Sequence, residues 1–323
     1  MNLLKATPEN ILKAANVIKE GGLVAFPTET VYGLGANGLD PIATAKIFEA
    51  KNRPSFNPLI LHIPSYEFIN QICDIDYSKI ENIVNKFWPG PLTLVLPKKD
   101  IVPDIITAGH PTVAVRIPRH PVAKELIQKA QTPVAAPSAN VFSHLSPTEA
   151  SHVVNQLGDR VDIILDGGSS NVGVESTIIQ IEDDEITLLR PGGLPAEDIE
   201  NLVGKKLNRK IPINETPNSP GQLPFHYSPK IPLKIIGRFD ESTLEGKKVG
   251  ALFFKSKQID FNFADERYLS KEGCLTEAAA NLFAFLHDME KENLDLIIAE
   301  PFAEEGLGMA IMDRLNKAAK RFE

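Results

Sequence analysis

Cysteine is almost missing from this sequence. Its 323 residues include only Cys73 and Cys274, which lie far apart along the chain. Two distant cysteines can supply neither a disulfide framework nor a zinc site with several cysteine ligands. We therefore expect both to pack as small hydrophobic side chains.

Long hydrophobic runs are missing as well. No apolar stretch approaches the ~20 residues that a membrane-spanning helix needs. The first residues, MNLLKATPEN, also lack the basic and then apolar pattern of a secretory signal. We expect a cytoplasmic protein with no membrane segment.

Positive charge is in the minority, with 34 Lys and Arg residues against 42 Asp and Glu residues and a formal net charge of −8. This balance argues against a protein that coats nucleic acid over a broad surface, although it leaves room for a local basic site. Hydrophobic residues make up 43% of the chain, which is enough to build a core. The length predicts one large domain or two of ordinary size.

The signatures of several familiar catalytic sites do not occur. The sequence contains no GxxxxGK[ST] phosphate loop, no HExxH helix, no GxSxG elbow and no cluster of Cys and His. Neither a covalent nucleophile nor a catalytic zinc is therefore indicated.

Helix and strand patterns alternate along most of the chain. Thr7 and Pro8 precede an apolar stripe that stops at Gly21 and Gly22, which predicts a helix. Other helical patterns begin at Pro41, Pro121 and Thr148. Short apolar runs rich in β-branched residues predict strands that begin at Leu23, Leu59, Leu92, Thr112, Pro133, Val161, Ser176 and Ile186. The alternation predicts a mixed α/β fold.

A change of composition divides the chain. From about Leu202 to Leu233 the sequence is dense in Pro, Asn and Lys and shows no sustained apolar period, which is typical of a linker or a long loop. Beyond it, strand patterns from Val249 and Leu294 alternate with helical patterns from Thr276 and Ala310. We predict a first domain at residues 1–203, a linker at 204–232 and a smaller α/β domain at 233–323.

A glycine-rich segment follows the first predicted strand. Gly33, Gly35 and Gly38 match the GxGxxG spacing of a dinucleotide-binding turn. The acidic residue expected ~20 positions further on is missing, and Arg53 stands there instead. NAD binding is therefore the less favoured interpretation, and a nicotinamide fluorescence titration would exclude it.

The segment PTETVYG begins at Pro27 and places Thr28 and Thr30 on either side of Glu29. Taken alone, it is as well explained by a tight turn capped by threonines as by a functional site. His62 lies inside an apolar strand run, where a lone histidine is more often a satisfied core side chain than a catalyst.

Several cations and hydroxyls stand at the ends of predicted elements. Lys51 and Arg53 precede a proline and suit phosphate binding, although basic residues also complement the dipole of any last helical turn. Arg116 and Arg119 follow a strand, and one of them can hold a carboxylate through two hydrogen bonds. The pattern fits a site that binds polyanions and positions reactants.

Ser146-Pro147-Thr148-Glu149 has the spacing of a capping box with proline at the first helical position. We therefore expect a helix to start there. Because a helix N-terminus also attracts phosphate, Ser146 can be a cap and a ligand at once.

Eight motifs occur in an order and spacing that point to one family. They are PTETVYGLG from Pro27, KNRP from Lys51, NPLILH from Asn57, FWPGPLTLVL from Phe87, VAVRIP from Val113, APSAN from Ala136, GVESTI from Gly173 and LLRPG from Leu188. Together they resemble the YrdC-like domain. SPGQLPFHYSP from Ser219 and GLGMAIMDRLNKAA from Gly306 resemble the linker and C-terminal domain of the long, two-domain threonylcarbamoyl-AMP synthases. The resemblance implies a twisted mixed sheet with flanking helices, followed by a smaller Rossmann-like α/β domain.

The resemblance implies a nucleotidyltransferase. L-Threonine, bicarbonate or CO2, and ATP would give threonylcarbamoyl-AMP and pyrophosphate, and the product would serve threonylcarbamoyladenosine modification of tRNA. A further implied partner is the tRNA threonylcarbamoyl-transferase complex that consumes the product, while direct tRNA binding stays open. Mg²⁺ is implied with ATP, and because no compact carboxylate pair is evident, substrate oxygens and water are expected to fill most of its shell.

The resemblance also implies roles for individual residues. Threonine would be bound by Thr30, His62, Arg116, Ala136 and Ser176, with Arg116 on its carboxylate and Ala136 beside its methyl group. ATP would be held by Arg53, Asn57, Thr112, Ser138, Asn140, Ser146 and Arg190, and by His226 or Tyr227 of the linker. Lys51 and Arg53 would act as catalytic cations, with Lys51 and Asn140 beside the phosphates.

The linker is expected to fold over the nucleotide as a lid, because both the carbamate and the adenylate are lost to water. In the family, basic residues commonly precede the His-Tyr pair of the linker. Here Gln222-Leu223-Pro224-Phe225 stand in their place.

Two further functions are alternatives. Hydrogenase-maturation carbamoyltransferases, which use carbamoyl phosphate, contain a similar domain, but they are much longer and carry Cys-rich zinc modules that two distant cysteines cannot supply. A non-catalytic RNA-binding module is the other alternative. The net charge of −8 and the lack of interleaved aromatic and basic residues argue against it.

Overall fold

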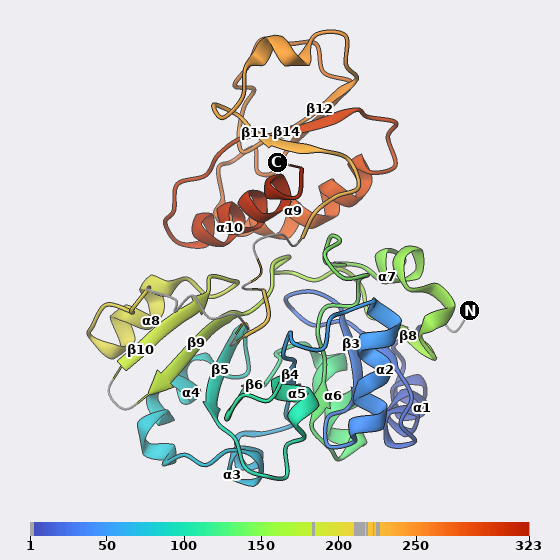
Figure 1. Ribbon diagram of the computed structural model, residues 1–323, viewed down its shortest axis with the longest axis vertical. Helices are drawn as coiled ribbons and strands as arrows, with labels where there is room; N and C mark the ends of the chain where they lie inside the picture. The colour runs from blue at the N-terminus through green and yellow to red at the C-terminus, as the bar shows by residue number, and fades with distance from the viewer. Residues whose placement is uncertain are drawn as a thin grey trace.

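The computed structural model describes residues 3–182, 185–209, 217, 219–221, 223 and 227–322. The strands of this part of the chain form two separate sheets, one in the larger lower body and one in the smaller upper body of Figure 1. The large sheet has ten strands in the order β1-β8-β2-β3-β7-β4-β6-β5-β9-β10. The small sheet has four strands in the order β11-β14-β12-β13.

The strands have the following bounds. In the large sheet they are β1 (Leu3–Lys5), β2 (Val24–Phe26), β3 (Gly33–Asn37), β4 (Ile60–His62), β5 (Leu92–Pro97), β6 (Thr112–Arg116), β7 (Val134–Ala135), β8 (Ile163–Asp166), β9 (Thr177–Glu182) and β10 (Glu185–Arg190). In the small sheet they are β11 (Leu233–Ile235), β12 (Val249–Phe253), β13 (Asp265–Tyr268) and β14 (Leu296–Ala299).

Helices surround both sheets. The α-helices are α1 (Pro8–Lys19), α2 (Pro41–Lys51), α3 (Ile69–Ile72), α4 (Glu81–Phe87), α5 (Asp104–Thr107), α6 (Pro121–Ala130), α7 (Ala150–Gln156), α8 (Ala196–Val203), α9 (Leu275–Met289) and α10 (Leu307–Lys320). Short 3₁₀ segments lie at η1 (Tyr66–Phe68), η2 (Tyr77–Lys79), η3 (Gly158–Arg160) and η4 (Glu241–Leu244).

The large sheet is mixed, as the resemblance to the YrdC-like domain implied. Strand β2 pairs antiparallel with β3 and parallel with β8, and β4 pairs parallel with β6. The eight apolar runs predicted as strands correspond to β2 and to β4 through β10. The mixed α/β fold is therefore confirmed.

Strand β3 contains Gly33 and Gly35, two of the three glycines that were interpreted as a possible dinucleotide-binding turn, and Gly38 follows the strand directly. It lies in the middle of the sheet, between β2 and β7. A Cβ atom on Gly35 would lie 2.8 Å from the Phe26 ring and 2.8 Å from Val134. Glycine is used at this position to let neighbouring side chains pack across the strand, so its spacing is not a phosphate-binding turn here.

The first helix begins and ends where the sequence predicted. The Thr7 side chain accepts a hydrogen bond from the backbone N–H of Asn10, Pro8 is the first helical residue, and the chain turns at Gly21 with φ +79°. The helix predicted to start at Ser146 is different. Helix α7 begins only at Ala150, so the capping-box prediction is wrong.

The small domain has an all-parallel sheet. Helices α9 and α10 lie between this sheet and the large body (Figure 1). Val31, Leu145 and Val174 of the large body belong to the same buried apolar cluster as residues of α9 and α10, including Phe283 and Ile311. The two bodies are therefore joined by a shared core, while the exact domain boundaries stay a prediction.

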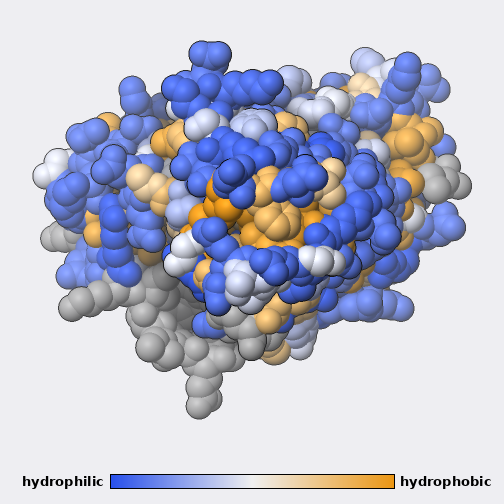
Figure 2. All heavy atoms as spheres, turned by 90° about the horizontal axis from the view of Figure 1, so that it is seen from above, coloured by the Kyte–Doolittle hydropathy of each residue, from blue (hydrophilic) through white to orange (hydrophobic). Residues whose placement is uncertain are grey.

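The outer surface is largely polar at the end where the small domain lies. Figure 2 looks onto this end and shows mostly hydrophilic residues, with apolar groups gathered near the middle of the view. Within the ranges described above, no helix is long and apolar enough to cross a membrane.

Candidate active site

The ends of several strands and part of the linker enclose a pocket. Its walls come from the turn after β2, the ends of β4, β6 and β10, the loop after β7, the start of β9 and the linker. The lining residues are Thr28, Thr30, Val31, Gly33, Arg53, Ile60, His62, Arg116, Ala136, Pro137, Ser138, Glu175, Ser176, Arg190, Pro220, Gly221 and Tyr227. All five residues predicted for threonine are among them.

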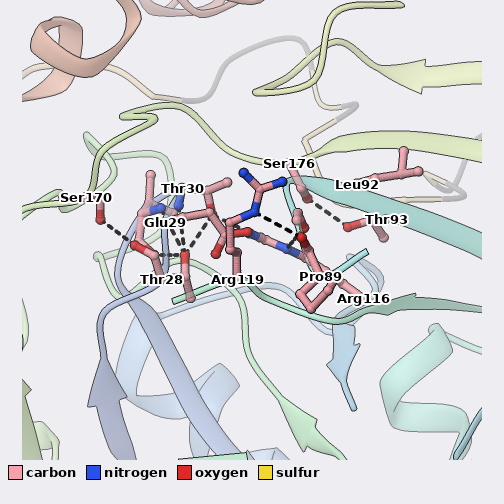
Figure 3. A network of polar contacts seen from close by, with 12 residues as sticks. Thr28, Glu29, Thr30, Pro89, Leu92, Thr93, Arg116, Arg119, Ser170 and Ser176 are labelled. Atoms are coloured by element: carbon pink, nitrogen blue, oxygen red, sulfur yellow. Dashed lines mark hydrogen bonds and ion pairs between the residues drawn. The ribbon is translucent and has the colours of Figure 1, made fainter. Parts of the chain in front are cut away.

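The turn after β2 holds two threonine hydroxyls at the pocket (Figure 3). The Thr28 hydroxyl lies 2.7 Å from the Thr30 hydroxyl and donates to the Val31 carbonyl over 2.6 Å. It also accepts hydrogen bonds from the backbone N–H groups of Thr30 and Val31. The segment is thus a threonine-capped turn and a wall of the pocket at the same time.

Arg116 is the last residue of β6, and its side chain contacts this turn. Its Nη1 donates to the Thr30 hydroxyl over 2.9 Å, and its Nε donates to the Gly90 carbonyl over 3.1 Å. Its Nη2 lies 2.7 Å from Oε1 of Glu29 (Figure 3). A guanidinium has more N–H donors than these contacts use, so Arg116 keeps the capacity to bind a carboxylate.

The Glu29–Arg116 pair is ionised and buried. Glu29 is 7% exposed and Arg116 is 3% exposed. Burial alone would raise the pKa of Glu29, but the neighbouring Arg116 guanidinium outweighs it and holds this pKa below its usual value. The pair therefore places a fixed, oriented cation at the pocket wall.

His62 ends β4 and is almost fully buried. Burial, together with the positive charge of Arg116, lowers the pKa of His62 to about 3. The imidazole is neutral near pH 7, so it can offer one N–H and one lone pair rather than a charge. The Ser176 hydroxyl, which also lines the pocket, lies 2.8 Å from the Thr93 hydroxyl.

Two further cations line the pocket. Arg190 ends β10, and its Nη2 donates to the Ser176 carbonyl over 2.8 Å and to the Ser176 hydroxyl over 3.1 Å. Arg53 follows α2, and its Nη2 donates to the Pro58 carbonyl over 2.8 Å. Both guanidiniums are held by carbonyl oxygens rather than by carboxylates, which leaves their charge available to an anion.

Five of the sequence-predicted residues do not line this pocket: Lys51, Asn57, Thr112, Asn140 and Ser146. Thr112 begins β6, whereas Arg116 ends it, so the two lie at opposite ends of the strand. Asn57 is completely buried, and its side-chain amide has no hydrogen-bond partner among the described residues. The roles assigned to these residues stay predictions.

Lys51 forms hydrogen bonds with the loop after β7. Its Nζ donates to the carbonyls of Ser138 and Asn140, each over 2.5 Å, and the Asn140 amide donates to the His144 carbonyl over 2.8 Å. Burial and the nearby charge of Arg53 lower the pKa of Lys51 well below its usual value. Lys51 therefore shapes the loop that carries Ser138 into the pocket.

The linker closes one side of the pocket. Pro220, Gly221 and Tyr227 line it, and Tyr227 is 1% exposed. Gly221 has φ +85°, and a Cβ atom there would lie 2.5 Å from the Tyr227 hydroxyl and 2.9 Å from Arg190, so only glycine fits. His226, the other predicted linker contact, lies outside the described residues.

Two charged residues that sequence reasoning did not assign are central to the site. Glu175 lines the pocket, accepts a hydrogen bond from the Ser146 hydroxyl and pairs with Arg314 of α10. Glu175 lies inside the GVESTI motif, so the sequence contained a pattern that could have identified it as a site residue. Arg314 lies inside the GLGMAIMDRLNKAA motif, but its burial was not expected, because a basic residue on an amphipathic helix usually faces solvent.

Comparisons with known proteins place the chain among characterised relatives. A sequence model of the Sua5/YciO/YrdC family, described as "Telomere recombination", matches residues 16–192, and a model described as "Threonylcarbamoyl-AMP synthase, C-terminal domain" matches residues 194–320. A threonylcarbamoyl-AMP synthase of Pyrococcus abyssi is 45% identical over 95% of this chain and 93% of its own length. One of Bacillus subtilis is 41% identical over 98% of this chain and 94% of its own length.

Solved structures agree with these matches. The crystal structure of P. abyssi Sua5 complexed with L-threonine superimposes with a TM-score of 0.89 and 41% identity, covering 99% of this chain and 96% of that one. Escherichia coli YciO shares the fold, with a TM-score of 0.51 and 22% identity over 58% of this chain and 90% of its own.

Proposed function

The chain belongs to the Sua5/YciO/YrdC family, and from this membership we propose that it is the enzyme that makes threonylcarbamoyl-AMP and pyrophosphate from L-threonine, bicarbonate or CO2, and ATP. In this proposal it is a nucleotidyltransferase. The observation that carries the proposal is one pocket lined by three arginines, which are Arg116, paired with Glu29, and the further cations Arg53 and Arg190.

The proposed chemistry joins two anions. The threonine amine, once deprotonated, forms a carbamate with CO2. A carbamate oxygen then attacks the α-phosphorus of ATP, the bond between the α-phosphorus and the bridging oxygen breaks, and pyrophosphate leaves. Because both reactants are negatively charged, the protein's task is to offset their repulsion and to align them.

Threonine would bind at the Arg116 end of the pocket. The Arg116 guanidinium suits its carboxylate, and the Thr30 and Ser176 hydroxyls and the neutral His62 ring suit its hydroxyl and amine. Ala136 would lie beside the methyl group. The crystal structure of the P. abyssi relative in complex with L-threonine supports this choice of amino acid.

ATP would bind with its phosphates toward Arg53 and Arg190 and near Ser138. Lys51, which holds the Ser138 and Asn140 carbonyls, would keep that loop in shape. Mg²⁺ would arrive as part of the MgATP substrate. No group of three or more His, Cys, Asp and Glu side chains suited to a metal occurs in the described part of the chain, so phosphates and water would supply most of its ligands.

The linker would close over the reactants, because Pro220, Gly221 and Tyr227 already form one wall of the pocket. The reaction would take place in the cytoplasm, and its unstable product would pass to the complex that transfers the threonylcarbamoyl group to tRNA.

Pyrophosphate release tests the proposal. The full chain is mixed with MgATP, L-threonine and bicarbonate, and each substrate is omitted in turn. We expect pyrophosphate only when all three are present, together with an adduct that has the mass of threonylcarbamoyl-AMP. Pyrophosphate release that does not depend on threonine, or no release from a protein that binds both substrates, would refute the assigned reaction.

A further inference from the structure

One arginine of the small domain reaches into the large domain. Arg314, on α10, is 1% exposed and is among the largest fully buried side chains described. Its Nε donates to Oε2 of Glu175 over 2.9 Å, and its Nη1 donates to the Pro191 carbonyl over 2.8 Å. In Figure 1, α10 lies on the side of the small domain that faces the large body. The small domain thus places a fixed positive charge directly behind the pocket.

Its partner Glu175 is part of the pocket wall and is 6% exposed. The other carboxylate oxygen of Glu175, Oε1, accepts a hydrogen bond from the Ser146 hydroxyl. Burial alone would raise the pKa of Glu175, but the charges of Arg314 and Arg190 and the Ser146 hydrogen bond outweigh it and lower this pKa. Glu175 is therefore a negative charge in a pocket whose described lining also includes the cations Arg53, Arg116 and Arg190.

The same helix also holds the linker. The Arg314 guanidinium carbon lies 4.9 Å from the centre of the Tyr227 ring, a cation–π contact. One turn further along, Lys317 Nζ donates to the Gly221 carbonyl over 2.7 Å. Tyr227 and Gly221 both line the pocket. Helix α10 therefore contacts two separate parts of the pocket wall, the linker and Glu175.

We propose that Arg314 is a positioning residue through which the C-terminal domain prepares the nucleotide half of the pocket. It compensates the charge of Glu175 and holds the carboxylate that orients Ser146. The proposal rests on the proposed function, because it takes ATP as the anion that binds there. Without Arg314, Glu175 would be an incompletely compensated anion beside the triphosphate, where the low dielectric makes repulsion strong.

An uncompensated charge on Glu175 should affect the two substrates differently. MgATP carries net negative charge and would be repelled by an uncompensated Glu175. Threonine is a zwitterion with no net charge and would bind at the Arg116 end, where neither Glu175 nor Arg314 is a partner of Arg116. Loss of Arg314 should therefore weaken ATP binding and leave threonine binding nearly unchanged.

Binding calorimetry on three full-length variants and the wild type tests the proposal. In R314M we expect the Kd for MgATP to rise about tenfold or more, with the Kd for threonine within about twofold of wild type. In the double variant R314M/E175Q the negative charge at position 175 is absent, and the glutamine oxygen can still accept a hydrogen bond from Ser146. The Kd for MgATP should therefore return most of the way to the wild-type value. Lys320→Met, an exposed cation on the same helix, is the matched control and should change neither affinity.

R314M leaves a buried carboxylate without its main partner and can fail to fold. In that case R314K replaces R314M in the test. Lysine keeps the charge but cannot reach both Glu175 and the Pro191 carbonyl with the geometry of a guanidinium. We expect it to weaken ATP binding by a smaller factor and to leave threonine binding unchanged.

Three results would overturn the inference: unchanged ATP affinity in R314M and R314K, equal loss of both substrates, or no recovery in the double variant. A wild-type protein that neither binds ATP nor releases pyrophosphate would instead refute the proposed function. The two failures are therefore distinguishable.

Discussion

Arg116 and Glu29 form a buried ion pair, with Nη2 of the arginine 2.7 Å from Oε1 of the glutamate. The pair comes from two elements that are distant in sequence, the end of β6 and the turn after β2. It orients the Arg116 guanidinium before any substrate arrives, so the cost of fixing a long side chain is met during folding rather than during binding.

The role of Arg116 is tested by removing both charges of the pair. In R116M/E29Q we expect the Kd for threonine to rise about 10- to 100-fold, the range for loss of a charged hydrogen bond. The Kd for MgATP should stay close to that of wild type. E29Q alone should still bind threonine, because Arg116 remains and the substrate carboxylate can replace its counter-ion.

The matched control for this experiment is Arg119→Met. Arg119 is exposed and its Nε donates to the Pro89 carbonyl over 3.1 Å, so its loss should not affect threonine binding. Equal threonine affinity in R116M/E29Q and wild type would exclude Arg116 as the carboxylate ligand.

Acid should destabilise the protein through its buried carboxylates. The pKa values of Glu29 and Glu175 are lowered from 4.5 in the folded protein, so both groups stabilise it fully above that pH. As the pH falls below 4.5 and through the lowered folded values, the unfolded chain binds more protons and this stability is lost. Urea unfolding across this range should show a shallower decline in E29Q than in wild type. Parallel curves would mean that Glu29 titrates normally.

His62 should stay neutral throughout the physiological range. Its pKa is lowered from 6.5 to about 3, mainly by burial. In NMR spectra its ring signals, assigned with the variant H62Q, should not titrate between about pH 8 and pH 5. Because the unfolded chain takes up the proton first, His62 stabilises the protein above pH 6.5 and loses this contribution as the pH falls towards 3. Titration of the ring near pH 6.5 would contradict the structure.

We expect the loss of Lys51 to affect mainly the stability of the protein and the loss of Arg53 to affect mainly ATP binding. K51M leaves the buried Ser138 and Asn140 carbonyls without this donor, which should lower the free energy of unfolding by about 1–3 kcal/mol for each. R53M removes a pocket cation and should mainly raise the Kd for MgATP. Lys13→Met, at an exposed position on α1, controls for the loss of charge, whereas Lys46 on α2 is unsuitable because its Nζ donates to the Gly21 carbonyl over 2.6 Å. Similar free energies of unfolding in K51M and K13M would refute the structural role of Lys51.

A chain cut after Ile211 should give far less product than the full chain, since it loses the linker, α10 and Arg314. It also exposes Val31, Leu145 and Val174, which are buried with the second domain. Pyrophosphate release and analytical gel filtration of the truncated protein would measure both effects. Full-rate product formation by the truncated protein would show that neither the lid nor the second domain is needed.

The local elements were predictable because they depend on short-range patterns. The cap at Thr7 and the proline at position 8 begin α1, and the β-branched runs become strands. The prediction that a helix begins at Ser146 is wrong for a physical reason. Its hydroxyl could serve as a helix cap or hydrogen-bond a distant partner, and the buried carboxylate of Glu175 outweighs a single cap bond.

The sequence by itself determined the α/β class, the order of the motifs and the identity of most pocket residues, because motif spacing and side-chain chemistry are local properties of the chain. The tertiary structure alone decided which charges meet. Glu29 with Arg116, and Glu175 with Arg314, lie 87 and 139 positions apart, and no local pattern encodes such pairs. The pairing of strands in the large sheet and the packing of α10 against the large domain bury these groups. In this buried environment their ion pairs become strong enough to shape the site.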